Sequence, residues 1–206
     1  SDEIRYRISQ ATFVDLDQYF YPEPYSVLEG YDWRGRMYTS VQRIHDYLQK
    51  KGWERDTPIQ GYRFDATPPA GEPASTIAIP YPALCKVDWR YVADKGHYER
   101  YVQGEPHMDG STQEQIAADN VIIFYADHNK TDIVEDSLGS TAIDIVMIGS
   151  GRAQICRDGL VVEGQWVQKA PDELIQYYDD AGKLIPLKPG ITWIQLVPPD
   201  YDVVIH

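Results

Sequence analysis

His107 and Asp109 lie two positions apart in the segment 104–115, GEPHMDGSTQEQ. An imidazole beside a carboxylate can act as a general base with its orienting group, or the pair can ligate a metal ion. In an extended loop this spacing places both side chains on one face. The alternative is a tight turn, in which Asp109 accepts backbone N–H bonds around Gly110 and Ser111. We expect the turn for Asp109, which leaves His107 as a candidate whose role the turn does not explain.

A second candidate is the acidic segment 127–136, DHNKTDIVED. Its Asp127, His128 and Asp132 are candidate metal ligands, and the carboxylates among them offer the oxygen donors that suit calcium. However, the segment lacks the D-x-D-x-D-G spacing and the central glycine of a calcium-binding loop. We therefore expect a solvated acidic loop, and we predict neither a resident metal ion nor another cofactor.

Aromatic side chains are the third candidate, because they stack on flat ligands and anchor interfaces. They concentrate in the segment 19–38, which has little periodicity. The candidate binding residues there are Tyr21, Tyr25, Tyr31 and Trp33. By contrast, Trp89, Trp166 and Trp193 stand at alternating positions of predicted strands, so we expect them in the core.

The chain has two cysteines, Cys85 and Cys156. They could pair in an oxidising compartment, or each could pack as a small core residue. Neither belongs to a C-x-x-C or Cys/His ligand pattern, so a structural zinc site is not expected.

One helix is predicted at about 40–51, where apolar residues recur at helical spacing. Thr39 can cap it, with Gln42 three positions later completing a capping box. Ser111 and Glu114 have the same spacing, which predicts a short helix over 112–118.

The rest of the chain after residue 75 is predicted as strands. Period-two alternation in 84–92, followed by a turn and a returning strand, indicates a hairpin. The apolar run at 120–127 indicates a central strand, since it is apolar throughout. The segment 142–168 reads as three strands with an Asp-Gly hairpin, and 192–198 as a late strand.

The predicted fold class is α+β with β dominating: an antiparallel sheet, a roll or a partly open barrel in the C-terminal part. The proline-rich segment 66–75 is the predicted linker between an N-terminal helix-containing segment, 1–65, and a β domain, 76–206. The formal net charge of −13 disfavours nucleic acid and anionic lipid as partners. No apolar run approaches the ~20 residues that span a bilayer.

Many weak features in a fixed order carry a family resemblance over roughly residues 84–198. They are Tyr98 and Arg100; Gly104, His107 and Asp109; Asn120 and Val121; Gly149 and Gly151; Asp158 and Gly159; Trp166; Asp179 and Gly182; and Pro189, Gly190, Thr192 and Trp193. Together they resemble the YerB-like lipoprotein family of bacteria, labelled domain of unknown function 3048. The N-terminal part departs from the family, since Gly35 and Arg36 stand where members carry a His-Asn pair.

The resemblance implies a cell-envelope protein on the extracellular face of the bacterial membrane. Its only link to the membrane would be an N-terminal lipid that this chain does not carry. Our preferred hypothesis is a non-enzymatic binding or scaffolding module for a protein, peptide or glycan of the envelope. The alternative is an envelope hydrolase or metal-dependent enzyme that uses His107 and Asp109. Side-chain geometry discriminates them, since an enzyme needs His107 close to a second histidine or a carboxylate.

Overall fold

The computed structural model describes residues 6, 8–9, 13–32, 35–56, 61–82, 85–171 and 173–206. The chain divides into two compact units. The N-terminal unit comprises Ser1–Ile59 and Ile133–Ser140, and the β unit comprises Gln60–Asp132 and Thr141–His206. The domain boundaries inferred from the sequence, with a linker at 66–75, stay a prediction.

The main helix of the N-terminal unit is α2 (Val41–Lys51), at the predicted place. Its N-cap is Ser40, whose extended backbone lets its hydroxyl accept a hydrogen bond from Arg43 N at 3.3 Å. The prediction that Thr39 caps this helix is wrong. The Thr39 hydroxyl donates instead to the carbonyl oxygen of Pro24 at 2.6 Å.

Aromatic packing organises the remainder of the N-terminal unit. Tyr47 of α2 is buried, and its ring meets that of Trp53 edge to face at a centroid distance of 6.3 Å. Tyr21 meets the same indole at 5.6 Å. Two short strands, β1 (Ser26–Val27) and β2 (Met37–Tyr38), pair antiparallel.

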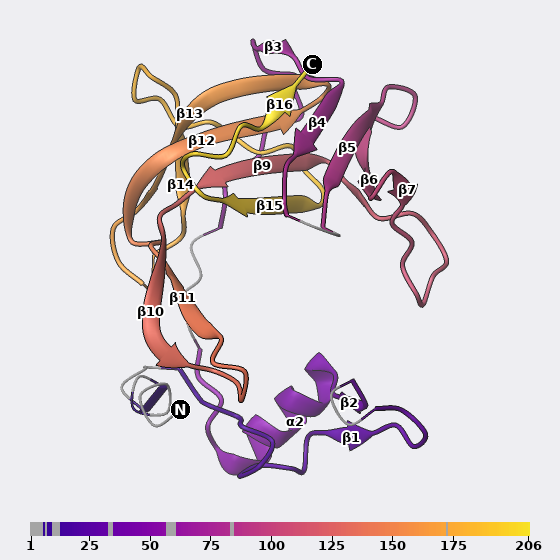
Figure 1. The fold of residues 1–206 in the computed structure, drawn as a ribbon, viewed down its shortest axis with the longest axis vertical. Helices are drawn as coiled ribbons and strands as arrows, with labels where there is room; N and C mark the ends of the chain where they lie inside the picture. The colour runs from indigo at the N-terminus through magenta and orange to yellow at the C-terminus, as the bar shows by residue number, and fades with distance from the viewer. Residues whose placement is uncertain are drawn as a thin grey trace. The chain divides into compact units, whose positions relative to one another are not determined.

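The first sheet of the β unit has the strand order β14-β13-β12-β9-β15, with β3 also paired to β13 (Figure 1). Its strands are β3 (Glu72–Pro73), β9 (Asn120–Tyr125), β12 (Gly149–Arg157), β13 (Leu160–Gln168), β14 (Gln176–Tyr178) and β15 (Thr192–Val197). The predicted central strand, hairpin and late strand are confirmed. Unexpectedly, β15 runs parallel to β9, which the long connection between them permits.

The second sheet of the β unit has the order β16-β4-β5-β6-β7, with β8 also paired to β6. Its strands are β4 (Thr76–Ile79), β5 (Val87–Val92), β6 (His97–Val102), β7 (Glu105–Pro106), β8 (Ala117–Ala118) and β16 (Val204–Ile205). The predicted β5–β6 hairpin is confirmed. The short helix predicted over 112–118 is wrong: Asp109 closes a turn there, and the chain then pairs with β6 as β8.

A separate two-stranded hairpin consists of β10 (His128–Val134) and β11 (Thr141–Ile145). The prediction of a solvated acidic loop over 127–136 is therefore wrong. Thr131 lies at the centre of β10, and its hydroxyl donates to the carbonyl oxygen of Ala142 on β11 at 2.9 Å. The segment forms a strand despite its acidic residues, because its β-branched residues Thr131, Ile133 and Val134 favour the pleated backbone.

Two hydrophobic clusters cover the two faces of β9, which explains its continuous apolar sequence. Val121 and Ile123 belong to the cluster that also contains Trp89 and Tyr98 of the second sheet. Ile122 and Phe124 belong to the other cluster, where the Phe124 ring stacks on Trp166 at 4.3 Å. The expectation that Trp89 and Trp166 lie in the core is confirmed; Trp193 is partly buried against the first cluster.

The two cysteines do not form a disulfide: Cys85 is exposed and Cys156 is buried in the first cluster. The predicted fold class is confirmed as a β-dominated α+β fold, and neither sheet closes into a barrel over the described residues. No helix within this part of the chain has the length and apolar character needed to cross a membrane.

Candidate ligand-binding site

His107 lies on the loop between β7 and β8, and main-chain hydrogen bonds hold it beside β6. Its N–H donates to the carbonyl oxygen of Arg100 at 3.0 Å, and its carbonyl accepts from Ile116 N at 2.8 Å. Gln115 adds a side-chain bond from Nε2 to the same Arg100 carbonyl at 2.9 Å. The loop therefore places the imidazole at a defined position on the second sheet.

Asp109 is occupied by its own turn. Its Oδ1 accepts hydrogen bonds from Thr112 N at 2.8 Å and Ser111 N at 2.9 Å. These bonds, that of Thr112 first, hold the pKa of the Asp109 carboxyl below its usual range. No hydrogen bond joins this carboxylate to His107 among the described residues, so the two do not form a base with its orienting acid.

His107 instead faces a guanidinium. Nη1 of Arg100 and Nδ1 of His107 are within hydrogen-bonding distance. A guanidinium can only donate, so this contact assigns the acceptor role to Nδ1 and the imidazole proton to Nε2. Nε2–H is then a donor available to a further group.

Arg100 occupies a core-facing position of β6. In the hairpin register it is paired with Trp89 of β5, which is fully buried. The guanidinium carbon lies 4.9 Å from the ring centroid of Trp193 and 5.9 Å from that of Trp89. Cation–π contact with two indoles explains how a charged group is tolerated beside the core.

The charge of Arg100 has no acidic partner among the described residues, although the side chain is half-buried. Its Nε is a buried nitrogen without a hydrogen-bond partner. Burial lowers the pKa of Arg100, opposed by the nearby Tyr81 phenol. An unpaired half-buried guanidinium is uncommon, because removing a charge from water is costly unless another charge compensates it.

A small polar network borders this site. Trp89 Nε1 donates to Gln195 Oε1 at 3.4 Å, and Gln195 Nε2 donates to the hydroxyl oxygen of Tyr81 at 3.0 Å. The Tyr81 hydroxyl donates in turn to the carbonyl oxygen of Leu196 at 2.6 Å. These groups satisfy one another, which leaves the donors of Arg100 and His107 as the free polar capacity of the site.

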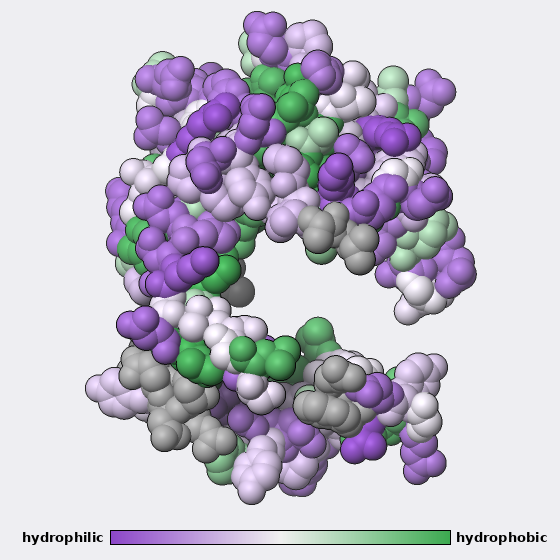
Figure 2. All heavy atoms as spheres, in the orientation of Figure 1, coloured by the Kyte–Doolittle hydropathy of each residue, from purple (hydrophilic) through white to green (hydrophobic). Residues whose placement is uncertain are grey.

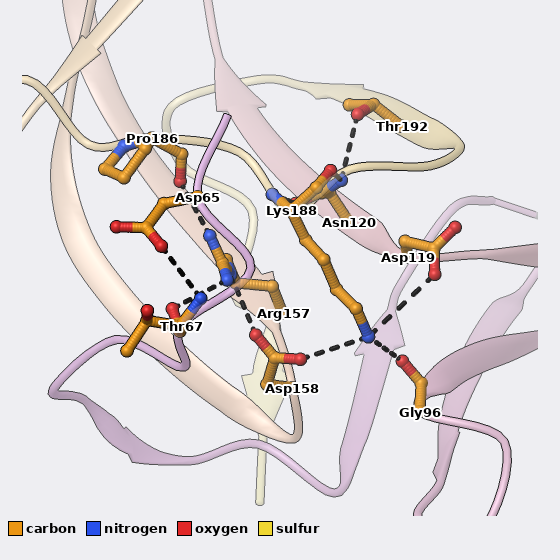
Figure 3. Close-up of polar contacts among 10 residues, drawn as sticks. All are labelled: Asp65, Thr67, Gly96, Asp119, Asn120, Arg157, Asp158, Pro186, Lys188 and Thr192. Atoms are coloured by element: carbon orange, nitrogen blue, oxygen red, sulfur yellow. Dashed lines mark hydrogen bonds and ion pairs between the residues drawn. The ribbon is translucent and has the colours of Figure 1, made fainter. Parts of the chain in front are cut away.

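A second polar cluster lies at the Asp158 hairpin, with Arg157 buried at its centre (Figure 3). The Arg157 guanidinium donates to Asp158 Oδ2 at 2.9 Å, to the Thr67 carbonyl oxygen at 2.9 Å and to that of Pro186 at 3.1 Å. Lys188 Nζ lies 3.1 Å from Asp158 Oδ1. Each of these charges is paired, so the cluster fixes the hairpin against segments 65–67 and 186–188.

Asn120 extends the same cluster to β9 (Figure 3). Its side chain donates to the Lys188 carbonyl oxygen at 2.9 Å and to Thr192 Oγ1 at 3.1 Å, and it accepts from Lys188 N at 2.7 Å. Asp119 Oδ2 accepts from Ile191 N at 2.9 Å. Asn120, Asp158 and Thr192, which belong to the family pattern, therefore stabilise the fold.

The metal candidates Asp127, His128 and Asp132 are not gathered into a site. His128 uses Nδ1 in a 2.8 Å hydrogen bond with the Ala126 carbonyl oxygen. Over the described ranges, no three His, Cys, Asp or Glu side chains are grouped so that they could hold a metal ion.

The candidate aromatic residues differ in exposure. Tyr31 is 65% exposed, whereas Tyr21 packs on Trp53 and the Tyr25 hydroxyl donates to the Leu16 carbonyl oxygen at 2.6 Å. Trp33 lies outside the described residues. The N-terminal unit also exposes large apolar side chains, and Figure 2 shows green apolar patches among polar ones. The exposed members include Phe13, Tyr19, Phe20, Met37 and Val41.

Arg100 is the site residue that the sequence-based search did not select. It belongs to the Tyr-x-Arg part of the family pattern, but a lone arginine in a strand is usually solvated. Its signal was positional: Tyr98 is two residues away on the same strand face, and Tyr98 is fully buried. A charge in phase with core residues marks either a paired ion or a ligand site.

Comparisons with known proteins agree with this architecture. "Putative lipoprotein YerB" of Bacillus subtilis (strain 168) is 28% identical over 167 residues, which cover 78% of this chain and 47% of YerB. The chain thus spans about half the length of this curated relative. The crystal structure of the YerB protein from Bacillus subtilis has a TM-score of 0.75 at 22% identity, over 99% of this chain and 68% of that one. This likeness shows the fold.

A family model described as "Protein of unknown function (DUF3048) C-terminal domain" matches residues 77–194, more than half of the chain. The match contains the Arg100–His107 site, Trp193 and the Asp158 hairpin, and it confirms the resemblance seen in the sequence. The chain belongs to the DUF3048 family.

Proposed function

We propose that this chain is a non-enzymatic binding module of the bacterial cell envelope. The observation that carries the proposal is the environment of His107. Its Nδ1 faces the Arg100 guanidinium, and the carboxylate of Asp109 is occupied by backbone N–H groups. General-base catalysis by a histidine needs an acceptor nitrogen directed at substrate, usually with a carboxylate behind the ring.

The envelope location rests on the relative YerB, whose name describes a lipoprotein. We propose that the whole protein is held on the extracellular face of the membrane by an N-terminal lipid. Its ligand is then a peptide, glycan or protein of the envelope. The net charge of −13 supports this restriction, because an acidic surface repels nucleic acid phosphates.

Binding and hydrolysis are separated by one experiment on soluble peptide–glycan fragments of digested bacterial cell wall. The protein is immobilised, the fragments are passed over it, and retained and released material is identified by mass spectrometry. The proposal expects fragments that are retained and recovered unchanged. New cleavage products that disappear in the His107→Asn variant would establish the hydrolase alternative.

A matched control is His45→Asn, which removes a histidine in α2 whose imidazole pairs with Glu54 at 2.6 Å. This variant should retain the fragments like the unchanged protein, since His45 lies in the other unit. Absence of retention in the unchanged protein would contradict the binding proposal.

A further inference from the structure

We propose that Arg100 receives a carboxylate group of the ligand, and that His107 Nε2–H and the Trp193 ring complete the site. This inference rests on the proposed binding function and names the chemical class that is bound. Three observations support it: the donors of Arg100 and His107 that make no hydrogen bond, the arrangement of the guanidinium N–H groups, and the single positive charge of Arg100.

Among the described residues, the polar groups of Arg100 and His107 that make no hydrogen bond are all donors. Nη1 of Arg100 is engaged with His107, Nε is buried without a partner, and Nη2 makes no hydrogen bond within the described residues. Nε2–H of His107 is a further donor. Of the bordering acceptors, Gln195 Oε1 accepts from Trp89 Nε1 and the Tyr81 hydroxyl oxygen accepts from Gln195 Nε2. A site that offers donors and a positive charge selects an anion.

The shape of the free edge selects a planar anion. Nη1 lies on the same side of the guanidinium as Cδ, so Nε–H and Nη2–H point together toward the opposite side. Two parallel donors of this kind match the two oxygens of a carboxylate. Nε is buried in the unliganded structure, so a carboxylate that uses both donors must displace the groups that cover Nε. The Trp193 ring lies against the guanidinium at 4.9 Å and provides a flat apolar wall beside it.

The charge favours a monoanion over a phosphate. Within the part of the chain that the structure describes, Arg100 is the one cation of the site, because an imidazole that accepts its hydrogen bond is neutral. No helix begins at this loop to add a dipole, since β6, β7 and β8 form its surroundings. The net charge of −13 further disfavours a dianion. A carboxylate places one negative charge opposite one positive charge.

Two envelope sources share this chemistry: the terminal carboxylate of a peptide and the carboxylate of a sugar acid. Each is represented by a small probe with a neutral partner of similar shape. N-acetylglycine and N-acetylglycinamide represent the peptide, and glucuronate and glucose represent the sugar acid. The experiment is a titration of the ¹⁵N-labelled full chain, observed at the arginine Nε–H and tryptophan Nε1–H resonances.

We expect both a saturable displacement of the Arg100 Nε–H resonance by at least one acid and a response of the Trp193 indole. The neutral partner should bind at least about tenfold more weakly, because it lacks the charge-assisted pair. The acid that binds more tightly identifies the source. Equal titration by acid and neutral probe, or no titration by either acid, would overturn the inference.

Arg100→Lys assigns the resonance and tests the edge, since a lysine keeps the charge but cannot bind in the bidentate mode. It should weaken the acid at least about tenfold while near-ultraviolet circular dichroism shows the unchanged fold. Arg152→Gln is the matched control, because Arg152 is paired with Glu163 at 3.5 Å and lies over the Tyr125 ring. This control should leave the titration unaltered, and an unaltered titration in Arg100→Lys would refute the proposed edge.

The same variants separate this inference from the proposed function. If cell-wall fragments are retained equally by the unchanged protein and by Arg100→Lys, the proposed binding function is supported and the proposed carboxylate site is refuted. If the fragments are not retained at all but the acids still titrate Arg100, the carboxylate site is supported and the bacterial cell wall is refuted as the source of the ligand.

Discussion

Arg100 shows how one residue can be costly for folding and useful for binding. A half-buried charge loses hydration, and contact with indole rings returns about 0.5–2 kcal/mol of that loss. The rings of Trp89 and Trp193 thus support the guanidinium without neutralising it. A ligand carboxylate would supply the missing counter-charge. The residue was hidden from sequence reasoning because its importance comes from the paired strand and from Trp193, 93 positions later.

Asp109 illustrates the opposite case, in which local sequence was sufficient. Asp followed by Gly and Ser predicted a turn closed by the carboxylate, and the structure contains those hydrogen bonds. His107 differs because it lies on the loop after β7 and contacts Arg100 of β6. The local sequence therefore predicted the turn at Asp109 but not the contact that His107 makes.

We predict that Asp109→Ala loosens this loop, whereas Asp109→Asn, which keeps an acceptor oxygen, does so less. Hydrogen exchange of the Ser111 and Thr112 amides measures the effect. The lowered pKa of Asp109 adds a pH dependence: its stabilising contribution is present above the unfolded pKa of about 3.9 and is lost as pH falls through the lower folded value. An Asp109 pKa at or above the unfolded value in an NMR titration would contradict this.

At the scale of elements, hairpins were predicted well and long-range pairing was not. The β5–β6 and β12–β13 hairpins follow from alternation and turn residues that are close in sequence. The parallel pairing of β15 with β9 depends on the path of the intervening chain, which alternation does not encode. The N-cap of α2 is Ser40 and not the predicted Thr39, because the Thr39 hydroxyl donates to the carbonyl oxygen of Pro24.

Two turn glycines give a matched test of how tightly a hairpin is packed. Gly159 and Gly182 have almost the same left-handed φ, 73° and 76°. A Cβ at Gly159 would lie 2.8 Å from ring atoms of Tyr91, whereas one at Gly182 would meet nothing within 4 Å. We predict that Gly182→Ala lowers the free energy of unfolding by about 1 kcal/mol, from the backbone alone.

Gly159→Ala should cost about 2–4 kcal/mol, since the ring must also move. Urea denaturation of both variants and the unchanged protein measures the difference. Equal losses in the two variants would mean that the Tyr91 ring relaxes freely away from the hairpin.

At the scale of the whole molecule, the two units differ in how much core each contains. Every described member of both hydrophobic clusters lies between Tyr62 and Ile205, within the β unit. Among the described residues of 1–59, Pro24 and Tyr47 are the two that are buried. A compact region with its own core can fold alone, whereas a segment of about 60 residues with little buried surface is marginal.

We therefore predict that a chain of residues 61–206 unfolds cooperatively on heating and keeps the near-ultraviolet circular dichroism of its buried tryptophans. The shorter chain 76–206, which begins at the boundary inferred from sequence, should be less stable. It lacks β3, the fully buried Ala74 and the Thr67 carbonyl that accepts from Arg157. Leaving donors of a buried guanidinium without a partner costs about 1–3 kcal/mol. Equal melting temperatures for the two chains would show that residues 61–75 are a linker, and failure of both to unfold cooperatively would show that the β unit depends on the N-terminal unit.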